Sequence, residues 1–329
     1  MRALVIVSGG DAENPFTTPE QACASGLAAG NTSTALRQHL LAEGHSVFTS
    51  PAKIGPGMIE FSPGFGGFAE GPDPLPAALT VNSVGDIDEA GQNLAAFWMY
   101  LQQAFGVSEL DVIGHSMGGL FARAAIRILH EQPDQPAQTA QPAQLLGDQI
   151  QGEPLLKVRS LLTIGTPWQG SFAADFARGD LDLAAAQGVS SIESVLTEFA
   201  KVAAEHPNGA GIEVTRRYLS EMAGNWNDQQ SGVLDSIPVT LIAGDYFRLA
   251  DPQSGTTDSA ATEVWPNDGL VACGSALAEG VPTAVLGKAQ QHVFPDVHSI
   301  FFADKLGLRW DQALTWDPQV LETVSNALK

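Results

Sequence analysis

The most constraining feature of this sequence is a serine between glycines where one structural pattern gives way to another. A strand-like apolar run over residues 110–113 stops at Gly114-His115-Ser116-Met117-Gly118, and a helix-forming stretch over 120–129 follows at once. This is the G-x-S-x-G nucleophile elbow in the strand-turn-helix context that it requires. So sharp a turn strains the serine backbone and leaves room only for glycine beside it. A chance glycine-rich turn is the less favoured alternative.

Strand-like and helix-like stretches alternate along most of the chain. The first apolar run, Ala3-Leu4-Val5-Ile6-Val7, is typical of a strand buried on both faces of a parallel sheet. A helix is predicted over residues 86–105, with Ser83 as its cap. The alternation predicts right-handed crossovers and an α/β fold with an open, mostly parallel sheet covered by helices on both faces. We expect one domain over residues 1–329. Strands are predicted over 3–7, 46–49, 110–113, 158–164, 237–243 and 282–286, and helices also over 35–42, 120–129 and 300–306.

Three segments interrupt the alternation. Residues 170–232 carry no strand signal but contain helical stretches at 192–204 and 214–222, so they are predicted to form a helical insertion. Residues 131–147 are rich in Gln, Pro and Ala and have little to bury, which indicates an exposed loop. Residues 51–76 are rich in Pro, Gly and Phe, and we expect a surface loop there with an aromatic wall.

Charge and cysteine content narrow the partners. The net charge is −21, with 16 Lys and Arg against 37 Asp and Glu, so nucleic acid and anionic lipid headgroups are not expected to bind. Cys23 and Cys273 are too few for a disulfide scaffold or a cysteine-built metal site, and two free thiols are favoured over one bridge. No stretch is apolar enough for a membrane anchor, and no signal peptide is evident, which predicts a cytoplasmic protein unless a leader was removed.

A serine hydroxyl becomes a useful nucleophile only when a base takes its proton, normally a histidine oriented by a carboxylate. After such an elbow, the acid and then the histidine follow on loops beyond late strands. Two histidines, His292 and His298, follow the last predicted strand. His298 is favoured because it lies on a proline-containing loop directly before an apolar helix, whereas His292 stands in a polar run typical of a solvated loop.

The acid has two main candidates, Asp245 and Asp268. Asp245 ends a predicted strand, a position that some hydrolases use. Asp268 is favoured because Gly269 lets the chain turn and Leu270-Val271 can pack inward to fix the carboxylate. The remaining late aspartates, Asp251, Asp258 and Asp296, are interpreted as solvated loop residues.

Three blocks together resemble those of the bacterial true lipases, which are triacylglycerol lipase-like serine esterases. These enzymes belong to the α/β-hydrolase superfamily. The blocks are Gly114-His115-Ser116-Met117-Gly118-Gly119, Gly165-Thr166-Pro167-Trp168-Gln169-Gly170-Ser171 and Asn267-Asp268-Gly269-Leu270-Val271. The similarity covers most of the chain apart from residues 11–30 and 131–144. It implies the α/β-hydrolase fold, Ser116 as nucleophile, Asp268 as acid and the late histidine as base.

The resemblance also implies that residues 170–232 form a cap, or lid, over an acyl pocket. Phe61, Phe65, Phe68 and Trp168 are candidates for contacting the acyl chain there. A place in the core is the alternative, and for phenylalanines in an α/β protein it is the commoner one.

Two positions depart from the family pattern. These lipases usually carry His-Gly after the first strand, where this chain has Ser8-Gly9-Gly10. Because an oxyanion hole can be built from backbone N–H groups, Gly10 and Met117 remain its predicted donors. Some of these lipases bind calcium just after the catalytic histidine; here no carboxylate or amide ligand follows until Asp304, so no metal is predicted.

The sequence therefore predicts a serine ester hydrolase of lipase or carboxylesterase type that works through an acyl-enzyme and needs no cofactor. Its expected partner is a small-molecule or lipid acyl ester. An acyl-thioesterase or acyltransferase would use the same triad, and only the pocket would differ. A non-catalytic binding protein with the hydrolase fold is the less favoured alternative, because a serine, an acid and a histidine are all present in the required order.

Overall fold

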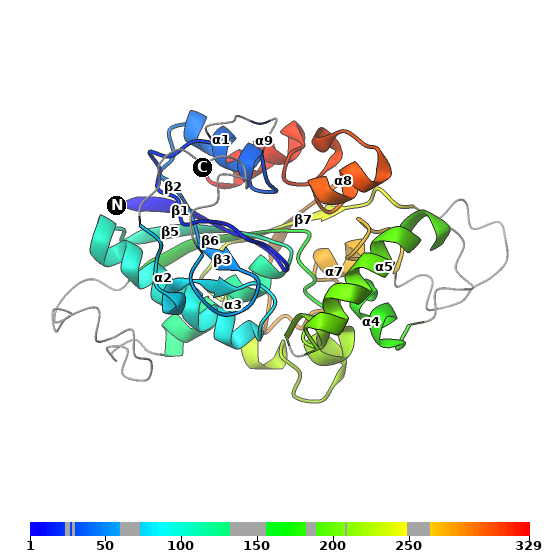
Figure 1. Ribbon diagram of the computed structural model, residues 1–329. Helices are drawn as coiled ribbons and strands as arrows, with labels where there is room; N and C mark the ends of the chain where they lie inside the picture. Colours follow the sequence, from blue (N-terminus) through cyan, green and yellow to red (C-terminus); the bar gives the residue numbers. More distant parts are fainter. Residues whose placement is uncertain are drawn as a thin grey trace.

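A six-stranded parallel sheet forms the centre of the molecule (Figure 1). Its spatial order is β2-β1-β5-β6-β7-β8, and each neighbouring pair of strands runs parallel. The strands span Arg2–Val7 (β1), Val47–Thr49 (β2), Glu109–His115 (β5), Lys157–Ile164 (β6), Val239–Gly244 (β7) and Ala289–Phe294 (β8). Ala52–Lys53 (β3) and Val81–Asn82 (β4) form a separate two-stranded parallel sheet. The predicted open parallel sheet is confirmed.

The computed structural model describes residues 1–23, 27, 30–59, 73–131, 156–181, 189–207, 209–248 and 264–329. Several predictions fall on other residues. The aromatic wall of Phe61, Phe65 and Phe68 lies outside the described residues, as does the Gln- and Pro-rich segment after Glu131. Asp251 and Asp258 also lie outside them.

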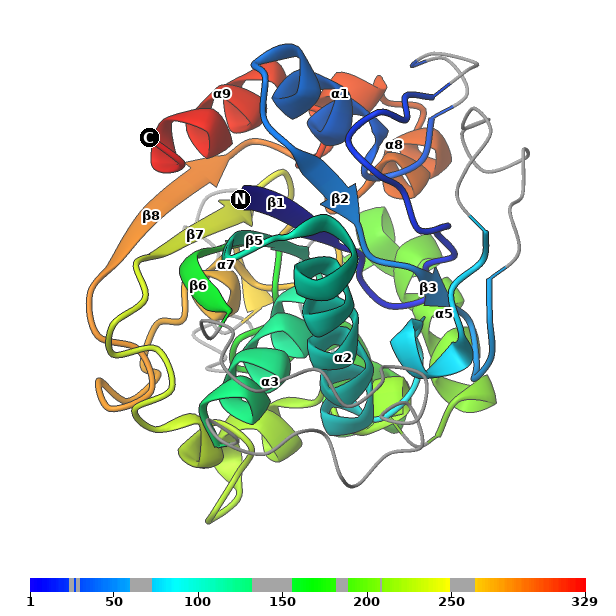
Figure 2. The same ribbon diagram turned by 90° about the vertical axis from the view of Figure 1, so that its left-hand side faces the viewer.

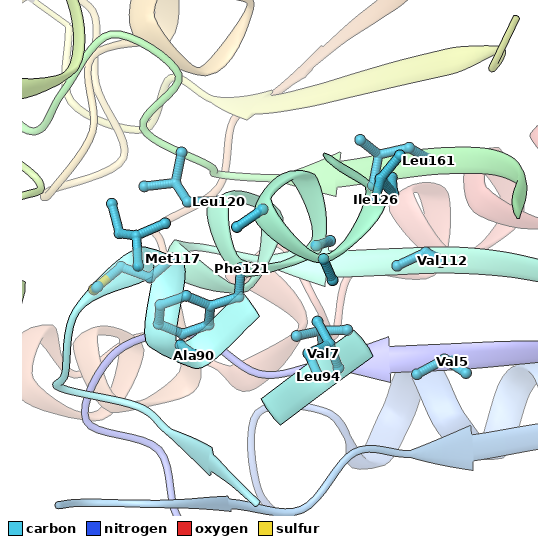
Figure 3. Packing of buried hydrophobic residues seen from close by; sticks show 14 of the residues in the cluster. Val5, Val7, Ala90, Leu94, Val112, Met117, Leu120, Phe121, Ile126 and Leu161 are labelled. Atoms are coloured by element: carbon cyan, nitrogen blue, oxygen red, sulfur yellow. The ribbon is translucent and has the colours of Figure 1, made fainter. Parts of the chain in front are cut away.

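Helices cover both faces of the sheet (Figures 1 and 2). One face carries Thr34–Ala42 (α1), Ile300–Leu306 (α8) and Pro318–Ala327 (α9), and the other carries Ile87–Phe105 (α2) and Met117–Glu131 (α3). Successive side chains of a strand point to opposite faces. In β1, Leu4 and Ile6 accordingly belong to the core under α1 and α9, whereas Val5 and Val7 belong to the core under α2 and α3. Figure 3 shows that second core, where β1 and β5 meet the two helices.

Helix α2 follows the predicted range, but its cap differs from the prediction. The carboxylate of Asp86 accepts from the N–H groups of Asp88 and Glu89, both at 2.9 Å, which satisfies two amides of the first turn. Ser83 instead donates to the carbonyl oxygens of Ala12 and Lys53 and so links three loops. The expectation that Ser83 caps the helix was wrong, because this nearer carboxylate occupies the cap position.

The last strand also differs from the prediction. Residues 282–286 form a turn in which the carbonyl of Pro282 accepts from the N–H groups of Val285 and Leu286. The last strand is β8, whose polar residues were not predicted to form one. As an edge strand, β8 pairs with β7 on one side only and leaves most of its side chains partly or fully exposed, so it needs little apolar surface. His292 therefore lies within β8, opposite Ile242, and not beyond the last strand.

A helical segment connects β6 to β7. It contains Phe172–Arg178 (α4), Val189–Glu205 (α5) and the short turns Gly209–Gly211 (η4), Arg217–Glu221 (η5) and Asp228–Gln230 (η6). Helix α5 matches the helix predicted over 192–204, whereas the one predicted over 214–222 is reduced to the π-helical turn η5. Figure 1 shows α4 and α5 together beyond the carboxyl ends of the strands.

This segment is bonded to the core at the start of α2. The carboxyl group of Glu213 accepts from the N–H of Ile87 at 2.6 Å and from the hydroxyl of Tyr218 at 3.0 Å. The pKa of Glu213 is raised to about 7, mainly by burial and secondly by the nearby carboxyl of Asp86. The contact therefore joins the helical segment to the first turn of α2, where Glu213 accepts from an N–H group that Asp86 does not reach.

Cys23 and Cys273 are both buried and form no disulfide with each other. Burial, and then the negative charge of neighbouring carboxylates, raises the pKa of the Cys273 thiol to about 11. Within the described part of the chain, no helix combines the length and the apolarity that crossing a bilayer requires.

Gly91 marks the closest approach of α2 to α3. A Cβ at this position would collide with Cβ of Ala124 and lie 3.1 Å from backbone atoms of α3. Gly91→Val is expected to lower the free energy of unfolding by about 2 kcal/mol, because overpacking costs about 1–3 kcal/mol and valine gains only a few tenths in helix propensity. Gly287→Val is the control, since nothing lies within 4 Å of a Cβ there. Equal denaturation midpoints for the two variants would contradict this packing.

Candidate active site

The predicted site residues gather at the carboxyl edge of the sheet. Strand β1 leads into Ser8-Gly9-Gly10, β5 into Ser116 and β6 into Gly165. Asp268 lies on the connection after β7, and His298 lies four residues beyond the end of β8. Ligands of open α/β sheets bind at this edge, so the topology brings together residues that are almost 300 positions apart.

Ser116 occupies the turn between β5 and α3 with a backbone φ of +55°. This left-handed conformation is strained for a residue other than glycine, and such strain is typical of functional sites. The turn is held on both sides, because the Ser116 N–H donates to Ile164 O at 2.8 Å and its carbonyl accepts from Thr166 Oγ1 at 2.8 Å. A Cβ on Gly114 would lie 2.5 Å from Gly119 N, and one on Gly118 would collide with Val7 O.

Asp268 and His298 form a short, buried hydrogen bond. His298 Nδ1 lies 2.6 Å from Asp268 Oδ2, and the side chains are 3% and 0% exposed. Oδ1 of the same carboxylate accepts from the N–H groups of Leu270 at 3.0 Å and Val271 at 2.8 Å. Because the carboxylate acts as acceptor, Nδ1 carries the hydrogen and neutral His298 keeps its lone pair on Nε2. The imidazole is therefore set to accept a proton at Nε2.

The imidazole of His298 lies beside Gly165, which directly follows the residue whose carbonyl accepts from the Ser116 N–H. A Cβ at Gly165 would be 3.1 Å from both His298 Cε1 and Asp268 Oδ2, and Gly165 has a φ of +59°, so this position favours glycine twice over. His298 Nε2 is buried and has no hydrogen-bond partner among the described residues, Ser116 Oγ included. Catalytic hydrogen bonds are often long in unliganded enzymes and shorten when substrate binds.

The turn after β1 lies against the elbow. A Cβ on Gly9 would approach Ser116 Cβ to 2.5 Å and Ser116 Oγ to 3.2 Å, and a Cβ on Gly10 would lie 2.8 Å from Met117 Sδ. Gly9 thus lies directly against Ser116, and Gly10 lies against the Met117 side chain. This placement supports Gly10 and Met117 as oxyanion donors.

A buried amide chain that the sequence did not reveal anchors the same turn. Asn14 Nδ2 donates to Ser8 Oγ at 2.6 Å, and Asn31 Nδ2 donates to Asn14 Oδ1 at 2.6 Å. Trp316 closes the chain by donating its indole N–H to the carbonyl of Asn31 at 3.0 Å. The sequence does not reveal this chain of bonds, because Asn14, Asn31 and Trp316 are far apart along it.

The less favoured candidates have other surroundings. The carboxylate of Asp245 pairs with Arg248, at 2.6 Å from Oδ2 and 2.8 Å from Oδ1, and forms no hydrogen bond or ion pair with a histidine among the described residues. His292 lies in the middle of β8 and away from the carboxyl ends of the strands. The structure thus brings together Ser116, Asp268 and His298 and leaves both alternatives outside.

Trp168 lies in the interior and not on an accessible wall. Its ring is fully buried, its indole N–H donates to Thr163 Oγ1 at 3.0 Å, and the guanidinium of Arg123 lies 4.0 Å from the ring centre. Arg123 also lies 4.8 Å from the ring of Trp226 and donates to Asn227 Oδ1 at 2.7 Å. These contacts join α3 to the helical segment. They favour a structural role for Trp168 over the predicted contact with substrate.

Asp296 contradicts its interpretation as a solvated loop residue. The residue is only 2% exposed. Burial, followed by the adjacent carboxyl of Asp317, raises the pKa of Asp296 to about 8. The sequence could not show this, because the loop before His298 is pinned to the distant 312–314 segment by backbone bonds from Val297 N to Gln312 O and from Leu314 N to Val297 O.

Comparisons with known proteins agree with this geometry. Residues 78–195, which include the elbow and α3, match the family described as "Putative serine esterase (DUF676)". The structure of the Staphylococcus hyicus lipase is similar at 16% identity and a TM-score of 0.52, over 99% of this chain and 95% of that chain. No curated protein matches the chain.

The Bacillus licheniformis lipase BlEst2 is also similar. Its mature form is 15% identical, with a TM-score of 0.48, over 99% of this chain and 91% of that chain. Its propeptide form is 15% identical, with a TM-score of 0.44, over 83% of this chain, and this chain spans 42% of that form.

The likeness to the Staphylococcus hyicus lipase decides the fold. The chain has the α/β-hydrolase fold. By its match to the serine esterase family it is an enzyme of the ester-hydrolysing kind. The predicted resemblance to bacterial lipases and serine esterases is confirmed at this level. Among the described residues, no cluster of three or more His, Cys, Asp or Glu side chains is arranged to hold a metal ion.

The raised pKa of Asp296 predicts how stability depends on pH. A carboxyl group whose pKa is 3.8 in the unfolded chain and about 8 in the fold stabilises the fold at low pH, and this contribution is lost as the pH rises from about 4 to 8. Asp296→Asn is therefore expected to gain thermal stability relative to the parent enzyme as the pH is raised from about 5 to 9. Asp228→Asn, on an exposed turn, is the control. A difference in melting temperature that stays constant with pH would contradict the buried carboxyl.

Proposed function

We propose that this hydrolase is a serine ester hydrolase of lipase or carboxylesterase type whose catalytic triad is Ser116, His298 and Asp268. The observation that carries the proposal is the 2.6 Å bond between His298 Nδ1 and Asp268 Oδ2, buried at the same sheet edge as the strained Ser116. The family match covers the nucleophile segment and supports the reaction type.

In the first half of the reaction, Ser116 Oγ forms a bond to the ester carbonyl carbon while its proton moves to His298 Nε2. The carbonyl oxygen becomes an oxyanion, which the N–H groups of Gly10 and Met117 stabilise. Asp268 stabilises the imidazolium through Nδ1–H and keeps the ring oriented. The tetrahedral intermediate collapses when His298 protonates the alkoxy oxygen and the carbon–oxygen ester bond breaks.

The second half repeats these roles with water. His298 removes a proton from water as its oxygen attacks the acyl carbon, and the same N–H groups stabilise the second oxyanion. Protonation of Ser116 Oγ by His298 then releases the carboxylic acid. The net reaction consumes one ester and one water and releases one alcohol and one carboxylic acid. Ser116, His298 and Asp268 return to their starting states.

Residues 170–232 form the proposed cap over the acyl pocket. Helix α5 comes close to the acid loop, because a Cβ on Gly269 would lie 3.9 Å from Val195 Cγ1. The Asp175 carboxylate accepts from Arg216 Nε at 2.6 Å and so joins α4 to the region before η5. The proposed substrate is a small-molecule or lipid acyl ester, and rates on esters of increasing acyl length would define it.

Fluorophosphonate labelling tests the nucleophile. The probe phosphonylates a serine only when its hydroxyl is activated by a base, so the parent enzyme is expected to be labelled and Ser116→Ala is expected to remain unlabelled. Ser231→Ala, which changes an exposed serine, is the control and is expected to label at the parental rate. Labelling of Ser116→Ala at the same rate would overturn the assignment.

The base is tested by a pair of histidine variants. His298→Ala is expected to lower kcat by at least about 10⁴-fold, because removal of a triad member leaves only the oxyanion hole and binding. His292→Ala is expected to keep a kcat within about twofold of the parent, since His292 lies within β8. The readout is hydrolysis of a chromogenic short-chain ester, and a reversed ranking of the two variants would assign the base to His292.

A further inference from the structure

His115, the residue before the proposed nucleophile, is a second buried histidine in direct contact with His298. The two side chains are part of one packed unit, with ring centroids 4.8 Å apart and an angle of 42° between the rings. His115 Nε2 lies 2.9 Å from the main-chain carbonyl oxygen of His298. His115 is only 6% exposed, and the proposed mechanism gives it no role.

The contact fixes the chemical form of His115. A carbonyl oxygen only accepts hydrogen bonds, so Nε2 must carry the hydrogen and the neutral ring keeps its lone pair on Nδ1. Burial, and then the adjacent His298, lower the pKa of His115 to about 3. The residue is therefore a neutral hydrogen-bond donor at the pH at which esterases work, and it adds no positive charge beside the imidazolium that His298 becomes.

The backbone of His298 is held from two directions. Its N–H donates to the carbonyl of Asp268 at 2.9 Å, and its own carbonyl accepts from His115 at 2.9 Å. The first bond ties His298 to another loop. The second ties it to the sheet, because His115 is the last residue of β5 and pairs with Ile164 of β6.

We propose that His115 is a positioning residue that sets the distance from the imidazole of His298 to Ser116 Oγ. Since His115 and Ser116 are consecutive, the donor that holds the base loop moves with the nucleophile. A shift of the elbow would carry the His298 main chain with it and preserve the reacting geometry. This inference rests on the proposed triad and adds to it a residue that acts through the backbone of the base.

The test compares two substitutions at His115. His115→Leu fills much of the space but removes the donor, whereas the side-chain N–H₂ of His115→Gln can replace Nε2–H. His115→Leu is expected to lower kcat by about 10- to 100-fold with KM nearly unchanged, because a small displacement of a catalytic group has effects of this size. His115→Gln is expected to recover most of the loss. Both variants are compared at matched thermal stability.

Two outcomes would overturn the proposal. Parental kcat in His115→Leu would show that the bond has no catalytic effect. Equal losses in the Leu and Gln variants, at equal melting temperature, would show that His115 acts only by filling space.

The ¹⁵N spectrum of the histidine-labelled parent enzyme tests the same contact without a disruptive variant. His115, assigned by the loss of its signals in His115→Gln, is expected to remain a neutral Nε2–H tautomer from about pH 5 to 8. A titration near the ordinary pKa of 6.5, or an Nδ1–H tautomer, would contradict the bond. If the parent hydrolyses no ester at all, the proposed function fails, and the tautomer still decides the contact.

Discussion

The hydrogen bond between His298 and Asp268 is the interaction on which the proposed chemistry of this hydrolase depends. An imidazole on a loop can rotate and can carry its hydrogen on either nitrogen, and the bond at 2.6 Å removes both freedoms. Asp268 is itself held by two backbone N–H groups, so its orientation does not depend on the histidine. The elbow strain, the glycine contacts and the cap become a catalytic arrangement only if Nε2 presents its lone pair to Ser116.

Close backbone approach is the second constraint, and it explains why glycines are concentrated at the sheet edge. Gly9 lies against Ser116, Gly118 against the end of β1, and Gly165 against His298 and Asp268. At Gly9 and Gly165 the main chain comes within reach of a side chain of the proposed triad, and at Gly118 the elbow packs against the end of β1. A methyl group at any of these three glycines would push apart two of the segments that form the candidate site. Close packing and the proposed chemistry therefore both favour glycine at these positions.

Much of the candidate site was predictable because its signals are local. Ser116 was recognisable from the strand, turn and helix around it, and Asp268 from the glycine and apolar pair after it. The parallel sheet was predictable from continuous apolar runs such as β1. The last strand was not, because β8 is an edge strand and its polar residues carry no such pattern.

What the sequence could not show is set by contacts between distant segments. Asp296 resembles a solvated loop residue until residues 312–317 are folded against it. His115 occupies a variable position of the elbow motif, and only its contact with a residue 183 positions later gives it a role. The anchoring of the Ser8-Gly9-Gly10 turn by Asn14 and Asn31 is of the same kind.

A crystal structure of the enzyme after reaction with an alkyl phosphonate tests the central claim most directly, because the adduct has the tetrahedral geometry of the intermediate. The account predicts phosphorus bonded to Ser116 Oγ and a phosphonyl oxygen accepting from the N–H groups of Gly10 and Met117. It also predicts His298 Nε2 within hydrogen-bond distance of an oxygen on phosphorus. An adduct on another residue, or a phosphonyl oxygen directed away from the turn after β1, would contradict it.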